Sequence, residues 1–252
     1  EKIRGLKFKD KVKVDVQTAE ELRKYIKQEV DREFGTGGTE GYIRGLVKIG
    51  ALKERIDFLE TISAMMVSQA AAHYDPSNKT YYLLMTNVSE MAIEFVSSHE
   101  LCHALQDQHF DLFNFVEMGT NRVKDNSDLD TARSSIVEGE ATIVMYIWMV
   151  MDQLGVDNIR IAEASAATMV SFQAAMDMDT IISMGDKALA SPELAGEWEG
   201  MIGSMQDLKN FPRFLTEQLF FQYMQGAMMV QYVKDSGGGW KAVEELYKKS
   251  PR

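Results

Sequence analysis

From Ser89 onward, apolar residues recur almost continuously at the three- and four-residue spacing of helices that bury one face. Ser89 can cap a helix that runs to about residue 110, and the pattern from Thr131 to about Leu154 predicts a second long helix. Further helices are predicted near residues 158–184, 192–207 and 211–234. This part of the chain is therefore expected to fold as a lobe of packed helices.

The segment before this helical region combines strand and helix patterns. Residues 11–17, KVKVDVQ, alternate in the manner of a half-buried strand, and a helix that Thr18 can cap follows them. Residues 70–85 predict a β-hairpin, because Asp-Pro-Ser-Asn is turn chemistry between two strand-like runs. The sequence thus predicts a predominantly helical α+β fold, with a small mixed sheet and hairpin in residues 1–89 and a helical lobe in residues 90–252.

Charge and composition exclude several classes of protein. The formal net charge of -11 argues against a phosphate-binding surface, so nucleic acid is not an expected partner. A single cysteine, Cys102, excludes a disulfide within the chain. The longest apolar run, at 143–151, is too short to cross a bilayer, so we expect no transmembrane span in the visible chain. The first residue is Glu1 rather than Met, and we therefore expect that an N-terminal segment is missing.

The string HELCH at residues 99–103 lies within one of the predicted helices. His99 and His103 are about one turn apart and project from the same face, so both imidazoles can reach one ion. Zinc suits two neutral imidazoles and a carboxylate, and in a catalytic site it keeps a fourth position for water. Glu100 lies about 100° round the helix from His99, where it can hydrogen-bond that water without ligating the metal.

A third ligand is needed, and the string SIVEGEAT on the next long helix offers two candidates. Glu138 is the better one, and Glu140 is the competing one. The two lie about 200° apart round the helix, so both cannot face the same ion. Glu140 can instead be explained as a solvated carboxylate or as one that supports a ligand.

HELCHALQDQ followed by VEGEAT resembles the gluzincin clan of zinc metallopeptidases, in which a Glu on a downstream helix completes the site begun by HExxH. In the aminopeptidase-like branch that Glu starts a Glu-Gly-x-Ala sequence, which Glu138-Gly139-Glu140-Ala141 matches. The resemblance covers about residues 70–145 and implies that residues 1–252 form a single zincin-like catalytic domain. It assigns one Zn²⁺ to His99, His103 and Glu138, and the role of general base to Glu100.

The resemblance also points to a donor for the oxyanion that forms during peptide hydrolysis. The segment FFQYMQGAMMVQYV resembles the late Tyr-x-x-Gly helix of compact gluzincin-like proteins, which makes Tyr223, with Gly226, the candidate. A tyrosine with a packed ring and a hydrated hydroxyl would show the same pattern. Tyr146 and Tyr232 are weaker candidates.

Other residues near the motif have two explanations each. Thr142 stands where thermolysin-like members carry an Asp, so its hydroxyl would make a weaker contact with a ligand. Asp107 could hold a ligand imidazole or a neighbouring backbone group. His73, in the hairpin, could line the substrate cleft or face solvent. Cys102 is expected to be a small buried residue behind the ligands.

The sequence therefore predicts a zinc-dependent metallopeptidase that uses metal-activated water and a Glu general base. The hairpin at 70–85 is expected to hold a peptide or protein substrate by strand addition. Two alternatives stay open: a zinc-binding protein of the same fold that no longer cleaves and acts as an interaction module, and a helical binding domain without metal. The resemblance to bacterial zincins is consistent with export to the envelope or the extracellular space. The substrate sequence and the oligomeric state stay open.

Overall fold

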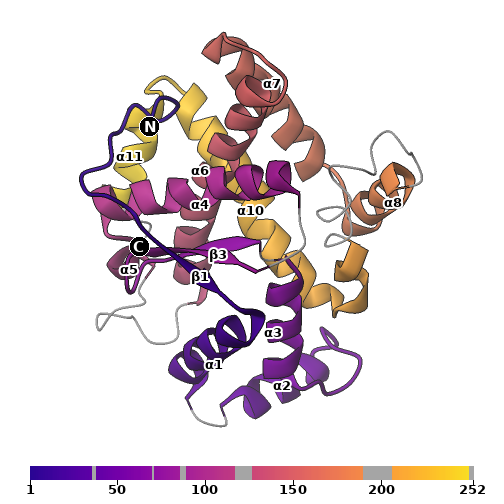
Figure 1. Cartoon of the computed structure of the whole chain (residues 1–252). Helices are drawn as coiled ribbons and strands as arrows, with labels where there is room; N and C mark the ends of the chain where they lie inside the picture. Colours follow the sequence, from indigo (N-terminus) through magenta and orange to yellow (C-terminus); the bar gives the residue numbers. More distant parts are fainter. Residues whose placement is uncertain (36–37, 70, 86–88, 117–126, 190–205, 250–252) are drawn as a thin grey trace.

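The computed structural model describes residues 1–252 apart from 36–37, 70, 86–88, 117–126, 190–205 and 250–252 (Figure 1). Helices dominate the described residues. The strands are β1 (Lys13–Gln17), β2 (Ala72–Asp75) and β3 (Thr80–Leu84). The helices before the hairpin are α1 (Ala19–Phe34), α2 (Thr39–Lys48) and α3 (Phe58–Gln69). Those after it are α4 (Glu90–Phe110), α5 (Leu112–Phe115), α6 (Ser127–Asp152), α7 (Ile159–Ala174), α8 (Met178–Leu189), the 3₁₀ turn η1 (Leu208–Asn210), α10 (Arg213–Asp235) and α11 (Trp240–Lys248). The predicted fold class, α+β and mostly helical, is confirmed.

The three strands form one mixed sheet in the order β1-β3-β2. β1 runs parallel to β3, whereas β2 and β3 are the antiparallel arms of the predicted hairpin. Asp75 closes the hairpin turn, since its carboxylate accepts hydrogen bonds from the Ser77 N–H at 2.8 Å and from Nδ2 of Asn78 at 2.9 Å. β2 is left at the edge of the sheet, and α4 packs against it.

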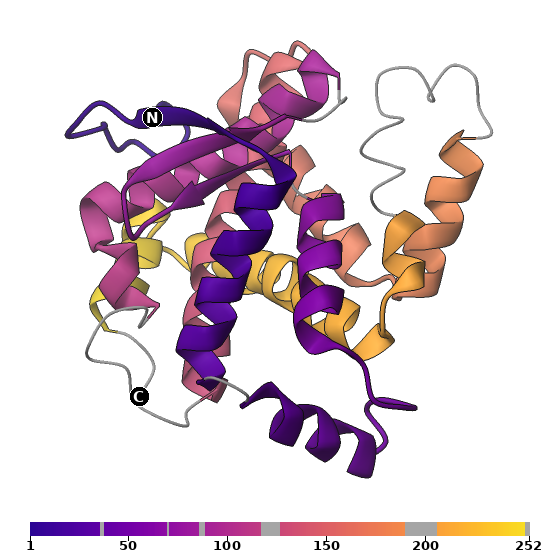
Figure 2. The ribbon, with the colours of Figure 1, turned by 60° about the horizontal axis from the view of Figure 1, so that its bottom comes forward.

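Helices α1 and α3 lie side by side next to the sheet (Figure 2). Thr18 caps α1 as expected: its hydroxyl accepts the Glu21 N–H at 3.2 Å, and Oε2 of Glu21 accepts the Thr18 N–H at 2.8 Å. Leu22 and Ile26 of α1 are buried against Leu84 of β3. The capped helix is thereby fixed to the sheet through its apolar face.

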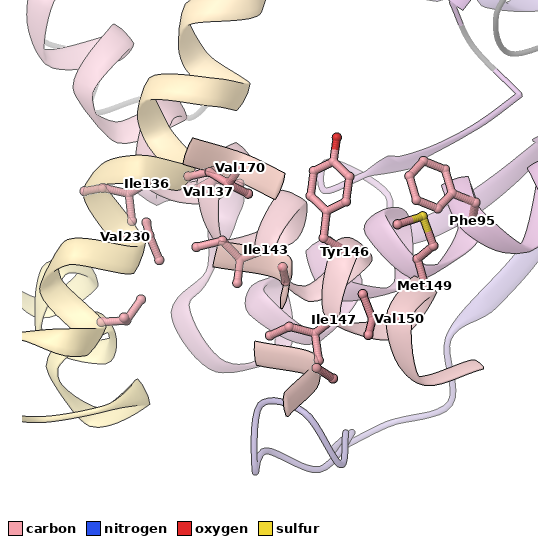
Figure 3. Packing of buried hydrophobic residues seen from close by; sticks show 14 of the residues in the cluster. Phe95, Ile136, Val137, Ile143, Tyr146, Ile147, Met149, Val150, Val170 and Val230 are labelled. Carbon is pink, nitrogen blue, oxygen red and sulfur yellow. The ribbon is translucent and has the colours of Figure 1, made fainter. Parts of the chain in front are cut away.

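The largest core lies around α6, which packs against α4, α7 and α10. Ile143, Ile147 and Val150 of α6 meet Val170 of α7 and Val230 of α10, and all five are almost fully buried (Figure 3). Full burial of a side chain of this kind contributes about 1.5–3 kcal/mol. This apolar contact fixes α6, which carries the SIVEGEAT string, within the helical lobe.

Helices α6 and α10 cross in direct backbone contact at two glycines. A Cβ added to Gly139 would lie 2.1 Å from the carbonyl carbon of Gly226, and one added to Gly226 would lie 2.2 Å from the carbonyl oxygen of Ser135. Both distances are far below van der Waals contact, so only glycine allows this approach. The crossing brings the residues next to these glycines on the two helices close together.

The prediction of one continuous helix near residues 158–184 is wrong, because the structure has two helices there. α7 ends at Ala174 and α8 begins at Met178. Between them, Asp177 starts a new helix, since its Oδ1 accepts the N–H of Thr180 at 2.7 Å. Apolar residues continue across the break, which hid it from periodicity alone. The helix predicted at 192–207 lies almost entirely outside the described residues.

Among the described helices, α6 is long and apolar enough to cross a membrane by length and composition. However, 72% of its most apolar window, within Asp128–Asp152, is buried inside the protein. The core helix of a soluble protein passes the same test, so this is weak evidence for a span. The expectation that the visible chain has no transmembrane span stays a prediction.

Candidate metal centre

Helix α4 places the three polar residues of HELCH at its buried side. Ser89 caps the helix, with its hydroxyl accepting the Ala92 N–H at 3.2 Å. One turn of helix separates His99 from His103, and their Nε2 atoms lie 3.0 Å apart. One ligand atom each from His99, Glu100 and His103 lies within 4.8 Å of the other two. The group could therefore hold a metal ion.

Glu138 approaches the same point from α6. Its Oε2 lies 3.1 Å from Nε2 of His99 and 3.4 Å from Nε2 of His103. Three potential ligand atoms from two helices thus form a triangle with edges of 3.0–3.4 Å. Glu140 does not join them, because its carboxylate is fully buried against Arg4 and the hydroxyl of Tyr247.

Glu100 is held beside the triangle by the sheet. Its Oε2 accepts the backbone N–H of Tyr74, in edge strand β2, at 2.8 Å. Burial raises the pKa of the Glu100 carboxyl, and the imidazoles of His103 and His99 oppose that rise in part. A carboxylate with a raised pKa next to a candidate ion can accept a proton more readily than an exposed one.

The Glu138 carboxylate and the His103 imidazole stabilise each other's charged forms. Burial acts to lower the pKa of His103, but the Glu138 carboxylate outweighs it and raises that pKa to about 9. Burial acts to raise the pKa of Glu138, but His103 and His99 hold it well below its usual range. Glu138 therefore stays ionised in the buried cluster, where it can offer a negatively charged oxygen to a cation.

Of the three tyrosines considered from the sequence, Tyr223 of α10 reaches this cluster. Its ring stacks on the imidazole of His99, with centroids 5.5 Å apart and planes at 19°. Burial raises the pKa of Tyr223 well above its ordinary value. The nearby carboxylates of Glu138 and Glu100 raise this pKa further, and the hydroxyl is hydrogen-bonded to Glu138. The hydroxyl therefore stays protonated and keeps its capacity to donate.

The two other tyrosines considered from the sequence lie elsewhere. Tyr146 donates its hydroxyl to Oε1 of Gln173, in α7. Tyr232 is 74% exposed. Neither has an interaction with the His99, His103 or Glu138 side chains among the contacts of the described residues.

Asp107 supports the site without touching an imidazole. Its Oδ1 accepts the backbone N–H of Leu112 at 2.9 Å, and its Oδ2 accepts the hydroxyl of Tyr74 at 2.9 Å. Of the two explanations considered, the structure shows contact with a neighbouring backbone group. The second bond connects α4 to β2, the strand that holds Glu100.

Thr142, Cys102 and His73 have no contact with the cluster. The hydroxyl of Thr142 is buried and has no hydrogen-bond partner among the described residues. Cys102 is buried beside Ala141, as expected for a scaffold residue. The imidazole of His73 lies between the rings of Tyr25 and Tyr82, at centroid distances of 5.7 and 5.1 Å, and burial lowers its pKa.

A cavity of about 300 Å³ opens beside the cluster. It is lined by Tyr25, Tyr74, Pro76, His103, Leu112, Val116, Ser134, Val137 and Glu138. Two potential ligands, His103 and Glu138, therefore border a space large enough for part of a small organic group or a peptide side chain.

Sequence reasoning missed Gln106 and Tyr247. Oε1 of Gln106 lies 2.8 Å from Nδ1 of His103, and Nε2 of Gln106 lies 3.0 Å from the hydroxyl oxygen of Tyr247. The three-residue step from His103 to Gln106 along one helix face was a signal for the first contact. Nothing local in the sequence indicates the second, which joins residues far apart in the chain.

None of the known protein families, curated proteins or solved structures compared with the chain matches it. The resemblance to gluzincins therefore rests on the motif residues alone, and the chemistry of the centre has to be argued from its own geometry.

Proposed function

We propose that the protein is a zinc-dependent metallopeptidase. The observation that carries the proposal is the convergence of His99 Nε2, His103 Nε2 and Glu138 Oε2 within 3.0–3.4 Å of one another. In a tetrahedral zinc site with bonds of about 2.0–2.1 Å, ligand atoms lie about 3.3–3.4 Å apart. The 3.4 Å edge of the triangle matches that spacing, and the edges of 3.0 and 3.1 Å come close to it. Two imidazoles with one carboxylate are a donor set of catalytic zinc.

Glu138 is preferred to Glu100 as the third ligand. One oxygen of Glu138 lies 3.1 Å from Nε2 of His99 and 3.4 Å from Nε2 of His103, whereas an oxygen of Glu100 already accepts the Tyr74 N–H at 2.8 Å. Glu100 is thereby held at the side of the cluster, where it can act on a water molecule. Each carboxylate then has a separate role.

His99, His103 and Glu138 would hold the zinc, which would supply Lewis-acid chemistry for attack of water on a scissile carbonyl. Glu100 would accept a proton from the attacking water and would later pass it to the leaving amine. Tyr223, protonated and stacked on His99, donates a hydrogen bond to the oxygen that becomes negative during attack.

A peptide substrate is supported by the sheet next to the centre. β2 is an edge strand packed on α4, and Tyr74 and Pro76, in and just after it, line the cavity that borders Glu138. An extended chain can add to an edge strand while one side chain enters an adjacent pocket. The proposed partner is thus a peptide or protein segment in an extended conformation.

The test compares metal content and hydrolysis in the same samples. Wild type, His99→Ala, Glu138→Ala and Glu100→Gln are purified without chelator, analysed for zinc and incubated with a broad peptide library. We expect about one zinc per chain in wild type and Glu100→Gln, loss in the two ligand variants, and cleavage by wild type alone. His109→Ala is a matched control on α4, because its imidazole instead contacts the carbonyl of Lys7 at 2.8 Å.

Each other outcome has a defined meaning. Zinc without cleavage in wild type would favour a non-catalytic zinc-binding protein. Absence of zinc from wild type would contradict the metal centre and favour a helical binding domain. Loss of zinc in Glu100→Gln with retention in Glu138→Ala would exchange the roles of the two carboxylates.

A further inference from the structure

Gln106 contacts the ring nitrogen of His103 that does not face the candidate metal position. Gln106 follows His103 by three positions in α4 and is 1% exposed. Its Oε1 lies 2.8 Å from Nδ1 of His103, whereas Nε2 of the same ring faces His99 and Glu138. The hydrogen bond at Nδ1 therefore determines which nitrogen of the neutral ring has a free lone pair.

The orientation of the Gln106 amide follows from its other contacts. Its Nε2 lies 3.0 Å from the backbone oxygen of Val137 and 3.0 Å from the hydroxyl oxygen of Tyr247. A backbone carbonyl can only accept a hydrogen bond, so the amide nitrogen has to face Val137. The amide oxygen then faces His103, and because it can only accept, Nδ1 has to carry the proton.

The contact with Tyr247 has a fixed direction as well. The Tyr247 hydroxyl donates to Oε2 of Glu140 at 2.7 Å, so it presents a lone pair to Gln106. Glu140 forms a buried ion pair with Arg4, which can only donate. Every donor between His103 and Glu140 thus points toward Glu140, and Arg4 donates to the same carboxylate.

Arg4 and Tyr247 come from opposite ends of the described chain. Figure 1 shows α11, which carries Tyr247, beside the N-terminal segment that carries Arg4. The Arg4 guanidinium also lies 4.4 Å from the ring centroid of Trp240, the first residue of α11. A buried charge with these contacts is costly to displace, so Glu140 is a fixed anchor for the hydrogen bonds that lead to His103.

We propose that Gln106 is a positioning residue that holds His103 in the tautomer with its proton on Nδ1. The residues that hold Gln106 in turn are Tyr247, Glu140 and Arg4. In this tautomer the lone pair of Nε2 is directed at the candidate metal position. A neutral ring protonated on Nε2 would instead donate to Glu138 and block that position. The inference rests on the proposed function for the identity of the metal, but the position of the proton can be measured without metal.

Loss of this hydrogen bond is expected to weaken zinc binding without removing a ligand. Replacing a group that holds a metal-bound imidazole lowers metal affinity about 10–100-fold. We expect a loss of that size in Gln106→Leu, in which an apolar side chain replaces the amide and cannot accept from Nδ1. Tyr247→Phe removes only one of the two acceptors of the Gln106 amide, so a smaller loss is expected.

Gln108→Leu is the matched control on the same helix. Gln108 accepts the backbone N–H groups of Lys9 and Asp10, at 2.7 and 3.1 Å, rather than contacting His103. Its zinc affinity, measured by competition with a chromogenic chelator, is expected to equal that of wild type. The comparison separates a general loosening of α4 from the loss of the Nδ1 contact.

The direct test is ¹⁵N NMR of the imidazole rings, which is tractable because the chain has 4 histidines. In full-length wild type we expect His103 to show a protonated Nδ1 that exchanges slowly with water, both with zinc and without zinc at a pH above about 9, where the ring is neutral. In metal-free Gln106→Leu that slow exchange should be lost. His99 is an internal comparison, since its Nδ1 is buried without a partner in the described part of the chain.

An unprotonated Nδ1 in the neutral His103 ring of wild type would overturn the inference, and this result does not depend on metal binding. Wild-type zinc affinity together with an unchanged Nδ1 signal in Gln106→Leu would overturn it too. If Gln106→Leu does not fold, the inference is tested by the wild-type spectrum and by the zinc affinity of Tyr247→Phe. A wild type that binds no zinc but has Nδ1 protonated would contradict the proposed function and leave this inference standing.

Discussion

Gly139 of α6 and Gly226 of α10 lie backbone against backbone, and this contact sets the distance between Glu138 and Tyr223. Gly139 follows Glu138 directly, and Gly226 lies three positions after Tyr223 on the same helix. A Cβ on Gly139 would lie 2.1 Å from the backbone carbon of Gly226. The close approach of the two helices is therefore part of how the candidate site is assembled.

We expect Gly139→Ala to destabilise the protein and to disturb the site together. Forcing atoms into a packed contact costs about 1–3 kcal/mol, and here the obstacle is backbone rather than a flexible side chain. Separation of the helices also moves Tyr223 away from Glu138. Chemical denaturation gives the loss of unfolding free energy, and zinc affinity should fall in parallel.

Gly45→Ala provides the control for this substitution. Gly45 lies within α2, and a Cβ there would meet nothing within 4 Å. Alanine at such an exposed helical position stabilises by about 0.5–1 kcal/mol because it restricts the unfolded chain. If Gly139→Ala were as stable as Gly45→Ala, the backbone contact between α6 and α10 would have no energetic role.

Tyr223→Phe is expected to reduce turnover while zinc stays bound. The phenyl ring can keep its stacking on His99, but the donor to the developing oxyanion is lost. Removal of one such donor lowers kcat about 10²–10³-fold. Steady-state kinetics should show the fall in kcat rather than a rise in KM.

Tyr146→Phe is the comparison for Tyr223→Phe, since Tyr146 gives its hydroxyl to Gln173 and not to the cluster. It should lose some stability and keep kcat. Equal kcat values in Tyr223→Phe and wild type would remove Tyr223 from the mechanism and leave the ligand assignment untouched.

The sequence predicted the helix that carries the HELCH string, because helix caps and helical spacing depend only on residues close together in the chain. Ser89 caps α4, and the helical spacing of His99 and His103 alone places their imidazoles on one face. The sequence also showed that Glu138 and Glu140 point to different sides of α6, so that only one of them can face the ion. The structure shows which way Glu140 faces, because its carboxylate pairs with Arg4, a residue of a distant segment. No local pattern in the sequence indicates this pair.

Contacts between distant segments account for what the sequence did not predict. Tyr247 contacts Gln106 although the two are 141 residues apart in the sequence, and hydrophobic periodicity cannot predict such a contact. The interruption between α7 and α8 was missed for a different reason. Apolar residues continue from α7 into α8, which Asp177 caps, so the two periodic runs appear continuous.

Asp107→Ala is expected to destabilise the protein by about 1–3 kcal/mol, because two donors lose their buried acceptor. These donors are the hydroxyl of Tyr74 and the backbone N–H of Leu112. The strand that holds Glu100 is then less firmly attached to α4, so kcat should fall as well. Thermal and chemical denaturation measure the first effect. Asp235→Ala, at an exposed position, should change stability by less than about 0.5 kcal/mol.

Removal of zinc should lower the unfolding temperature of wild type. A ligand that binds only the folded state stabilises it by about 2.7 kcal/mol when its free concentration is 100 times Kd. The folded state alone brings His99, His103 and Glu138 together, since Glu138 lies on a different helix from the histidines. Calorimetry with and without chelator measures the shift, and His99→Ala should show almost none. Equal zinc-dependent shifts in wild type and His99→Ala would mean that zinc stabilises the protein at another place.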